Sequence, residues 1–185
     1  MSNIEELNEI LAVRFGRRLY RDKRLRPTPY LIVPRKEHIQ LNKILILVLS
    51  KISNSKERNI WRRLYGSSRN KQKFGYTTIF STGTSSESDL TNQLITEAEK
   101  YGDILQADFD DSYRTLTLKM MSAIRYISIA AREVKAVLKV DDDISWRIRN
   151  VTEYINSEVN AKSATFHCYR HESGRSPPRK ESRKW

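Results

Sequence analysis

The chain has 185 residues, of which 38% are hydrophobic and 30% charged, with a formal net charge of +12. This length and composition fit one globular domain, or a piece of a larger protein, and exclude a predominantly disordered chain. The single cysteine, Cys168, excludes an internal disulfide. The longest aliphatic run, Ile44–Leu49, is far shorter than the ~20 residues of a membrane-spanning helix, and the acidic N-terminus lacks the apolar stretch of a signal peptide. We therefore expect neither a membrane anchor nor a targeting signal in this chain.

The first forty residues combine a short apolar stripe with many basic side chains. Ile4, Leu7 and Leu11 have helical spacing, but the same stripe continues into arginines, so a helix here would bury only its first half. Prolines at positions 27, 29 and 34 then interrupt regular structure. We predict that residues 1–40 form a basic stem or linker, that residues 1 to about 35 pack poorly, and that a folded domain occupies residues 41–185.

Strands and helices alternate from Lys43 onward. The run KILILVL is apolar throughout, which is typical of a strand that is covered on both faces of a parallel sheet. Polar residues and glycines separate the elements that follow it. Strands are predicted at 43–49, 76–80, 104–107 and 134–140, and helices through 57–65 and at about 89–101 and 112–132. This alternation indicates a layered α/β fold with a mostly parallel sheet and flanking helices.

Three consecutive acidic residues, Asp141, Asp142 and Asp143, follow the last predicted strand. Ligands of parallel sheets bind beyond the carboxyl ends of the strands, and side chains two apart in extended chain point the same way, so Asp141 and Asp143 would converge on one ligand. Carboxylates suit Mg²⁺ or Mn²⁺, which also bind substrate phosphates. The alternative from spacing alone is a solvated loop whose last aspartate caps a helix.

Several segments occur together in a fixed order. They are LILVLS, the stretch from Arg58 to Gly66, IFSTG, EAEKYGDILQADFDDSYRTLTLK, VLKVDDD and PPRKESRKW. In this order and spacing they resemble the β-1,3-galactosyltransferase family, which includes N-acetylglucosaminyl and fringe-like relatives, over roughly residues 42–185. The YGDIL, DFDDSY, LTLK and KVDDD series is the most specific part of the resemblance.

The resemblance implies a GT-A type nucleotide-sugar-binding domain, here incomplete, of which residues 41–185 are the N-terminal, donor-binding part. The family transfers a hexose from a UDP-sugar donor to a glycan or glycoprotein acceptor with inversion, in the Golgi. The aspartate motif Asp141–Asp143 would bind Mn²⁺ or Mg²⁺ and the diphosphate. The residues implied near the nucleotide-sugar are Arg58, Arg62, Asp111, Tyr113 and Lys119. Each has a plainer alternative: a solvated helix face for the arginines, core for Tyr113 and a surface charge for Lys119.

The chain also departs from the family's pattern. Thr115 stands where family members usually have Asn, Tyr65 where they have Trp, and Ala131 where they have Cys. The family's segment with the proposed catalytic base follows the element that ends here at Trp185. The catalytic residues are therefore unknown, and we expect the chain as given to transfer sugar poorly.

Two other classes of function were weighed against this one. A noncatalytic nucleic-acid-binding protein would use the basic ends of the chain, because residues 1–75 carry 18 basic and 6 acidic side chains whereas residues 76–160 carry 9 and 14. No nucleic-acid-binding module accompanies that charge, so nucleic acid is not the expected partner. A different metal-dependent phosphotransfer enzyme would use the same aspartates, but the chain has no glycine-rich phosphate loop.

Overall fold

The computed structural model describes residues 4–17, 19–39, 43–161 and 165–168. Five strands form one sheet in the order β1-β4-β3-β2-β5. The strands are β1 (Tyr30–Ile32), β2 (Ile44–Leu49), β3 (Tyr76–Thr84), β4 (Ile104–Asp110) and β5 (Ala136–Asp141). Strands β2 to β5 run parallel to one another, and β1 pairs antiparallel with β4. The predicted mostly parallel α/β fold is confirmed.

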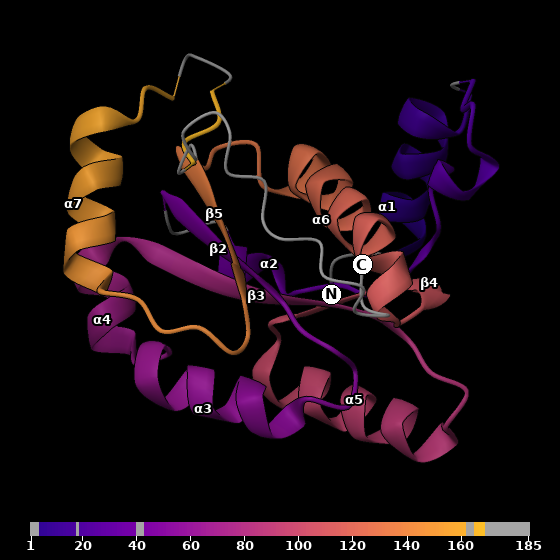
Figure 1. Cartoon of the computed structure of the whole chain (residues 1–185), viewed down its shortest axis with the longest axis horizontal. Coiled ribbons are helices and arrows are strands. Elements are labelled where there is room, and N and C mark those ends of the chain that lie inside the picture. The colour runs from indigo at the N-terminus through magenta and orange to yellow at the C-terminus, as the bar shows by residue number, and fades with distance from the viewer. Residues whose placement is uncertain (1–3, 18, 40–42, 162–164, 169–185) are drawn as a thin grey trace, which may run out of the picture.

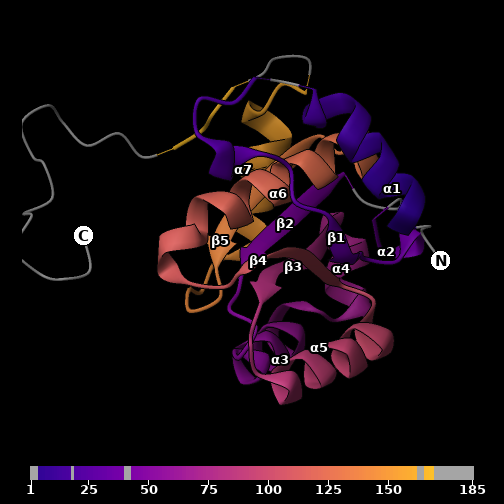
Figure 2. The same cartoon turned by 90° about the vertical axis from the view of Figure 1, so that its right-hand side faces the viewer.

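Helices cover both faces of this sheet. They are α1 (Ile4–Leu11), α2 (Lys36–Ile39), α3 (Ser55–Tyr65), α4 (Ser68–Phe74), α5 (Ser88–Tyr101), α6 (Leu116–Ala130) and α7 (Ile148–Glu158). Helices α1 and α6 lie on one side of the sheet, and α3 and α5 lie on the other (Figures 1 and 2). The chain therefore folds in three layers, with the sheet in the middle and β2 as an interior strand between β3 and β5.

The alternation of side chains along β2 divides the core into two parts. Leu45, Leu47 and Leu49 pack in the cluster that contains α1 and α6 residues, whereas Ile44, Ile46 and Val48 pack in the cluster with α3, α5 and α7 residues. All six side chains are buried. This is the reason that the sequence of β2 is continuously apolar rather than alternating, since each face of a central parallel strand meets a helix layer.

The expectation that residues 1 to about 35 pack poorly is wrong for α1 and β1. Leu7 and Leu11 of α1 are buried in the same cluster as the α6 residues. Asn8 holds β1 in place, because its side chain accepts from the Tyr30 backbone N–H at 2.8 Å and donates to the Tyr30 carbonyl at 3.0 Å. The Tyr30 hydroxyl in turn donates to the Ser122 carbonyl on α6 at 2.9 Å. The apolar half of the stripe is thus part of the core, and the division of the chain near residue 40 stays a prediction.

We predict that Leu11→Ala lowers the free energy of unfolding by about 2–3 kcal/mol, because it leaves a cavity between α1 and the core. Val13→Ala is the matched control, since the Val13 side chain is 65% exposed and its truncation removes no core contact. Urea denaturation of the two variants and the parent chain measures the difference. Equal effects of the two substitutions would show that α1 contributes nothing to the core.

Several other elements differ from the prediction. Helices α2, α4 and α7 and strand β1 were not expected, and β3 runs to Thr84 instead of ending at Phe80. The polar end of β3 remains a strand because β2 and β4 flank it on both sides: the Ser50 N–H donates to the Ser81 carbonyl, and the Gln106 side chain donates to the Gly83 carbonyl. Tertiary pairing thus overrides the polar local sequence.

Candidate functional site

The carboxyl ends of β2 and β5 meet at the point where the order of the strands reverses. Strands β2, β3 and β4 follow one another towards one edge, whereas β5 returns to the other side of β2. The register pairs Leu49 with Asp141, so the residues that follow each strand, Ser50 and Asp142, are neighbours. In open α/β sheets this reversal point is where ligands bind. The acidic motif therefore lies at the expected edge.

Asp142 is anchored to this edge by side chains from β2 and α3. Its Oδ2 accepts hydrogen bonds from Ser50 Oγ at 2.7 Å and from Asn54 Nδ2 at 2.9 Å. Its backbone carbonyl accepts from the Trp61 indole N–H at 2.9 Å. These three bonds fix the start of the turn that follows β5 and hold the Asp142 carboxylate beside the end of β2.

Asp141 and Asp143 are exposed on either side of this anchor. Lys139 donates to Asp141 Oδ1 at 2.8 Å, but both side chains are 40% or more exposed, so water and salt screen this ion pair. Strand β5 ends at Asp141 and a turn begins at Asp142, so the predicted alternation of an extended chain does not apply. Within the described ranges, no three His, Cys, Asp or Glu side chains are grouped closely enough to hold a metal ion. The convergence of Asp141 and Asp143 on one ligand stays a prediction.

Arg58 lies beneath this edge and is fully buried on α3. Its Nε and Nη2 donate to the two carboxylate oxygens of Glu97, each at 2.8 Å. Its Nη1 donates to Ser50 Oγ at 3.1 Å and to the Lys51 carbonyl at 2.6 Å, and Nη2 also donates to the Ile52 carbonyl at 3.1 Å. A guanidinium has five N–H donors, and all five are engaged inside the protein. Arg58 therefore positions the loop after β2, and direct contact with a nucleotide is not supported.

Arg62 lies one turn further along α3 and joins the same buried group. It forms a bidentate pair with Asp103 at 2.8 and 2.7 Å, and its Nη1 is 2.7 Å from Glu97 Oε1. Its guanidinium also lies over the rings of Tyr101 and Phe80. Arg58 and Arg62 share one helix face and bind carboxylates of the protein itself, Glu97 on α5 and Asp103 just before β4, so the alternative of a solvated helix face is wrong for both arginines.

The Arg58–Glu97–Arg62 group gives a pH-dependent contribution to stability. Burial raises the pKa of Glu97, but the hydrogen bonds and charges of Arg58 and Arg62 outweigh it and hold the pKa below the ordinary value of 4.5. Because the folded state holds the carboxylate ionised, its stabilisation is complete above the unfolded pKa and is lost as the pH falls through the lowered folded pKa.

As the pH falls below about 4.5, the free energy of unfolding of the parent chain should decrease because Glu97 becomes protonated. We predict that this decrease is smaller in Glu97→Gln, which has no carboxylate at this position. Glu99→Gln, an exposed position on the same helix, is the control and should leave the pH dependence unchanged. Urea denaturation at a series of pH values measures both. If the two variants follow the same curve, Glu97 is not the group responsible.

A second buried ion pair ties α6 to the same edge. Lys119 Nζ is 2.6 Å from Asp111 Oδ1 and donates to the Ser50 carbonyl at 2.7 Å. Asp111 Oδ2 accepts from the backbone N–H groups of Ile52 at 2.9 Å and Gly83 at 3.1 Å. Asp111 and Lys119 are 7% and 4% exposed, so the alternative that Lys119 is a surface charge is wrong. This pair connects the ends of β2, β3 and β4.

Tyr113 lies outside the core, and Ser50 is a residue of the site that the sequence did not predict. Tyr113 follows β4 in a short 3₁₀ turn and is 52% exposed, so it is not a core residue. Ser50 was not predicted as a site residue, yet it contacts Asp142, Arg58 and Lys119. The available signal was its position, because it is the first polar residue after an entirely apolar central strand.

The described residues include no helix that is both long and apolar enough to span a membrane. The mostly parallel sheet with helices on both faces (Figure 1) and the acidic motif beyond β5 fit the architecture of a GT-A type glycosyltransferase domain.

Comparison with known proteins gives the family. The Galactosyltransferase family profile matches residues 56–185. The chain is 35% identical over 141 residues to a β-1,3-galactosyltransferase 4 from Canis lupus familiaris, which covers 74% of this chain and 35% of that protein. It is 29% identical over 162 residues to a human lactosylceramide 1,3-N-acetyl-β-D-glucosaminyltransferase, covering 83% of this chain and 43% of that protein. The chain belongs to the galactosyltransferase family.

Each match covers a larger share of this chain than of the related protein. Against the two relatives above, the chain spans only 35% and 43% of their lengths. A human β-1,3-galactosyltransferase 5 gives the same picture, with 31% identity over 112 residues, 60% of this chain and 36% of that protein. The predicted family resemblance is confirmed, and nothing in the comparisons supports the nucleic-acid-binding alternative.

Proposed function

We propose that this chain is the donor-binding part of a hexosyltransferase that transfers a sugar from a UDP-sugar to a hydroxyl of a glycan or glycoprotein acceptor, with inversion. The observation that carries the proposal is the edge between β2 and β5, where Ser50 and Asn54 hold Asp142 and where Asp141 and Asp143 are exposed. Family membership supports it, because the relatives are named as β-1,3-galactosyl- and N-acetylglucosaminyltransferases.

The donor set at this edge fits a divalent cation of the Mn²⁺ or Mg²⁺ type. Such ions use hard oxygen ligands and need only one or two protein carboxylates, since waters and substrate phosphates complete the shell. Asp141 and Asp143 are exposed, and the screened Lys139 pair does not prevent Asp141 from exchanging partners. When bound, the cation would stabilise the negative charge of the departing diphosphate. The proposal includes all three aspartates, Asp141, Asp142 and Asp143, as ligands of the cation.

The buried charges have a supporting role in this proposal. Arg58 and Lys119 both bond to Ser50, which bonds to Asp142, so they fix the edge against which the donor would lie. Asp111 does the same for the loop after β2. Tyr113 is exposed after the end of β4, and we propose that its ring approaches the nucleotide-sugar. Because these side chains are already held in place, less conformational entropy is lost when a donor binds.

The site of action and the domain division are also proposals. The family resemblance supports a Golgi location, a stem over residues 1–40 and a donor-binding region over residues 41–185. The names of the relatives give galactose and N-acetylglucosamine as the sugars to test first.

We predict that UDP binding requires Mn²⁺ or Mg²⁺. Asp141→Ala and Asp143→Ala should each weaken metal-supported binding at least about tenfold, because each removes a carboxylate from the cation's surroundings. Asp108→Ala is the matched control, since Asp108 is an exposed aspartate on β4 that lies outside the acidic motif. Isothermal calorimetry with UDP, with and without chelator, measures these affinities.

Equal affinity for UDP with and without the metal would rule out the bridging role of the cation. Stronger binding of a polynucleotide than of UDP, persisting at moderate salt, would instead favour the nucleic-acid-binding alternative.

A further inference from the structure

A cavity lies at the opposite end of the sheet from the acidic motif. Its volume is about 830 Å³, and it opens at the amino ends of β2 and β3, where Lys43, Ile44 and Thr77 line it. Helices α2, α4 and α7 supply the other walls; α4 and α7 lie side by side at this end of the molecule (Figure 1). The cavity is within the size range of sites for small molecules.

Positive charge dominates the lining of this cavity. Lys43, Lys71 and Lys73 line it together with His38, and Glu37 is the only acidic residue among the lining residues described. Lys73 lies near the Phe74 ring, which forms an apolar part of the wall. A small molecule with a negatively charged group and a carbon framework would therefore meet complementary chemistry.

Lys71 is the partly buried lysine of this lining, whereas Lys43 and Lys73 are exposed. Within the described part of the chain, the Lys71 ammonium has neither a hydrogen bond nor an ion pair. Burial lowers its pKa, while nearby Asp103 raises it and nearby Arg62 lowers it. Asp103 is already held by Arg62 in a bidentate pair. The buried carboxylates Glu97 and Asp103 are thus matched by the two arginines of α3, and Lys71 is left as the surplus charge.

We propose that this cavity binds a tetrahedral oxyanion, a phosphate or sulfate group, through Lys71 with Lys43 and Lys73 around it. A phosphate or sulfate accepts several charge-assisted hydrogen bonds and would supply the partner that Lys71 lacks. The cavity exceeds the size of a bare anion, and Phe74 offers a surface for a ring. The group belongs either to a free inorganic anion or to a sugar ester. This site is independent of the metal-dependent edge at the other end of the sheet.

The test is a titration followed by amide NMR in the presence of chelator, so that the metal-dependent edge does not contribute. One arm uses inorganic phosphate and inorganic sulfate, and the other uses glucose 6-phosphate, all at constant ionic strength. We expect saturable shifts at Lys71, Gln72, Gly75 and Asn156, which line the cavity. Tighter binding of the ester identifies a sugar ester as the ligand, and equal binding identifies the free anion.

Matched variants make the test specific to Lys71. Lys71→Met should weaken binding on the order of tenfold or more, because it removes a charge-assisted contact. Lys71→Arg keeps the charge and should retain binding, which separates loss of the site from loss of the fold. Lys56→Met, at an exposed lysine on α3, should change nothing. Absence of saturable shifts at the cavity in the parent chain, or unchanged affinity in Lys71→Met, would overturn the proposal.

Discussion

Replacing Arg58 with methionine is expected to lower the free energy of unfolding by about 3–5 kcal/mol, because it breaks a buried ion pair by removing one partner. The Glu97 carboxylate would lose two of its hydrogen bonds, and the carbonyls of Lys51 and Ile52 would lose their donor. Folded proteins have a total stability of only about 5–15 kcal/mol, so this loss is a large fraction of it. Urea denaturation measures the change.

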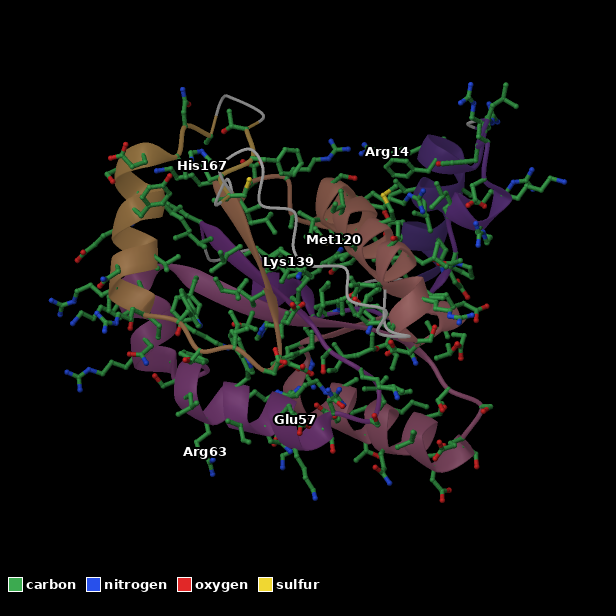
Figure 3. The ribbon with its side chains drawn as sticks, viewed as in Figure 1. Arg14, Glu57, Arg63, Met120, Lys139 and His167 are labelled. Atoms are coloured by element: carbon green, nitrogen blue, oxygen red, sulfur yellow. The ribbon has the colours of Figure 1, made fainter. Side chains whose placement is uncertain are left out.

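Two further variants isolate the cause of the Arg58 effect. Arg63→Met lies on the same helix, but Arg63 points away from the sheet (Figure 3), so we expect a change within about 0.5 kcal/mol. Arg58→Lys keeps the charge but cannot form the planar bidentate pair or five hydrogen bonds, so it should recover only part of the loss. A loss below about 1 kcal/mol in Arg58→Met would show that the buried guanidinium contributes little.

Lys119→Met should have a similar effect, about 3–5 kcal/mol, since it leaves the Asp111 carboxylate buried without its cation and leaves the Ser50 carbonyl without its donor. Asp111→Asn alone should also destabilise the fold, because Lys119 then keeps its charge without an ionic partner. The double variant removes both charges, so its loss should be smaller than the sum of the two single losses.

The double-mutant cycle for Asp111 and Lys119 is measured by the same urea denaturation. Additive losses would mean that the two side chains do not stabilise the fold as a pair. Amide NMR of the folded fraction adds a second readout, because shifts at Ile52 and Gly83 report directly on the Asp111 hydrogen bonds.

Much of the fold was predictable from the pattern of the chain. Strand β2 has six consecutive aliphatic residues, which predicted a buried strand. Gly102 follows α5 and adopts a left-handed conformation with φ 66°, so the glycine in the sequence marked the end of this helix. The missed elements lack such signals. Helix α4 has the sequence SRNKQKF, whose only apolar residue is Phe74, so it has no helical periodicity. Strand β1 has three residues between prolines, and its pairing depends on Asn8 and β4.

The candidate site was also predictable from the sequence only in part. The position of Asp141–Asp143 beyond a parallel strand followed from the sequence, because the carboxyl edge is a property of the fold class. The partners of the arginines did not follow from it, since Glu97 and Asp103 are 39 and 41 residues away from Arg58 and Arg62. The turn at Asp142 was also not predictable, because it depends on Ser50 and Asn54, which are about 90 residues earlier in the sequence and follow the neighbouring strand β2.

The central claim is that the edge between β2 and β5 holds the diphosphate of a UDP-sugar through a divalent cation. Paramagnetic Mn²⁺ tests it most directly, because the ion broadens the amide signals of the residues nearest to it. With UDP present, we predict selective broadening at Asn54 and at Asp141 to Ile144, reversed by chelator and reduced in Asp141→Ala and Asp143→Ala. Broadening confined to other regions of the fold, or none at this edge in the presence of UDP, would contradict the account.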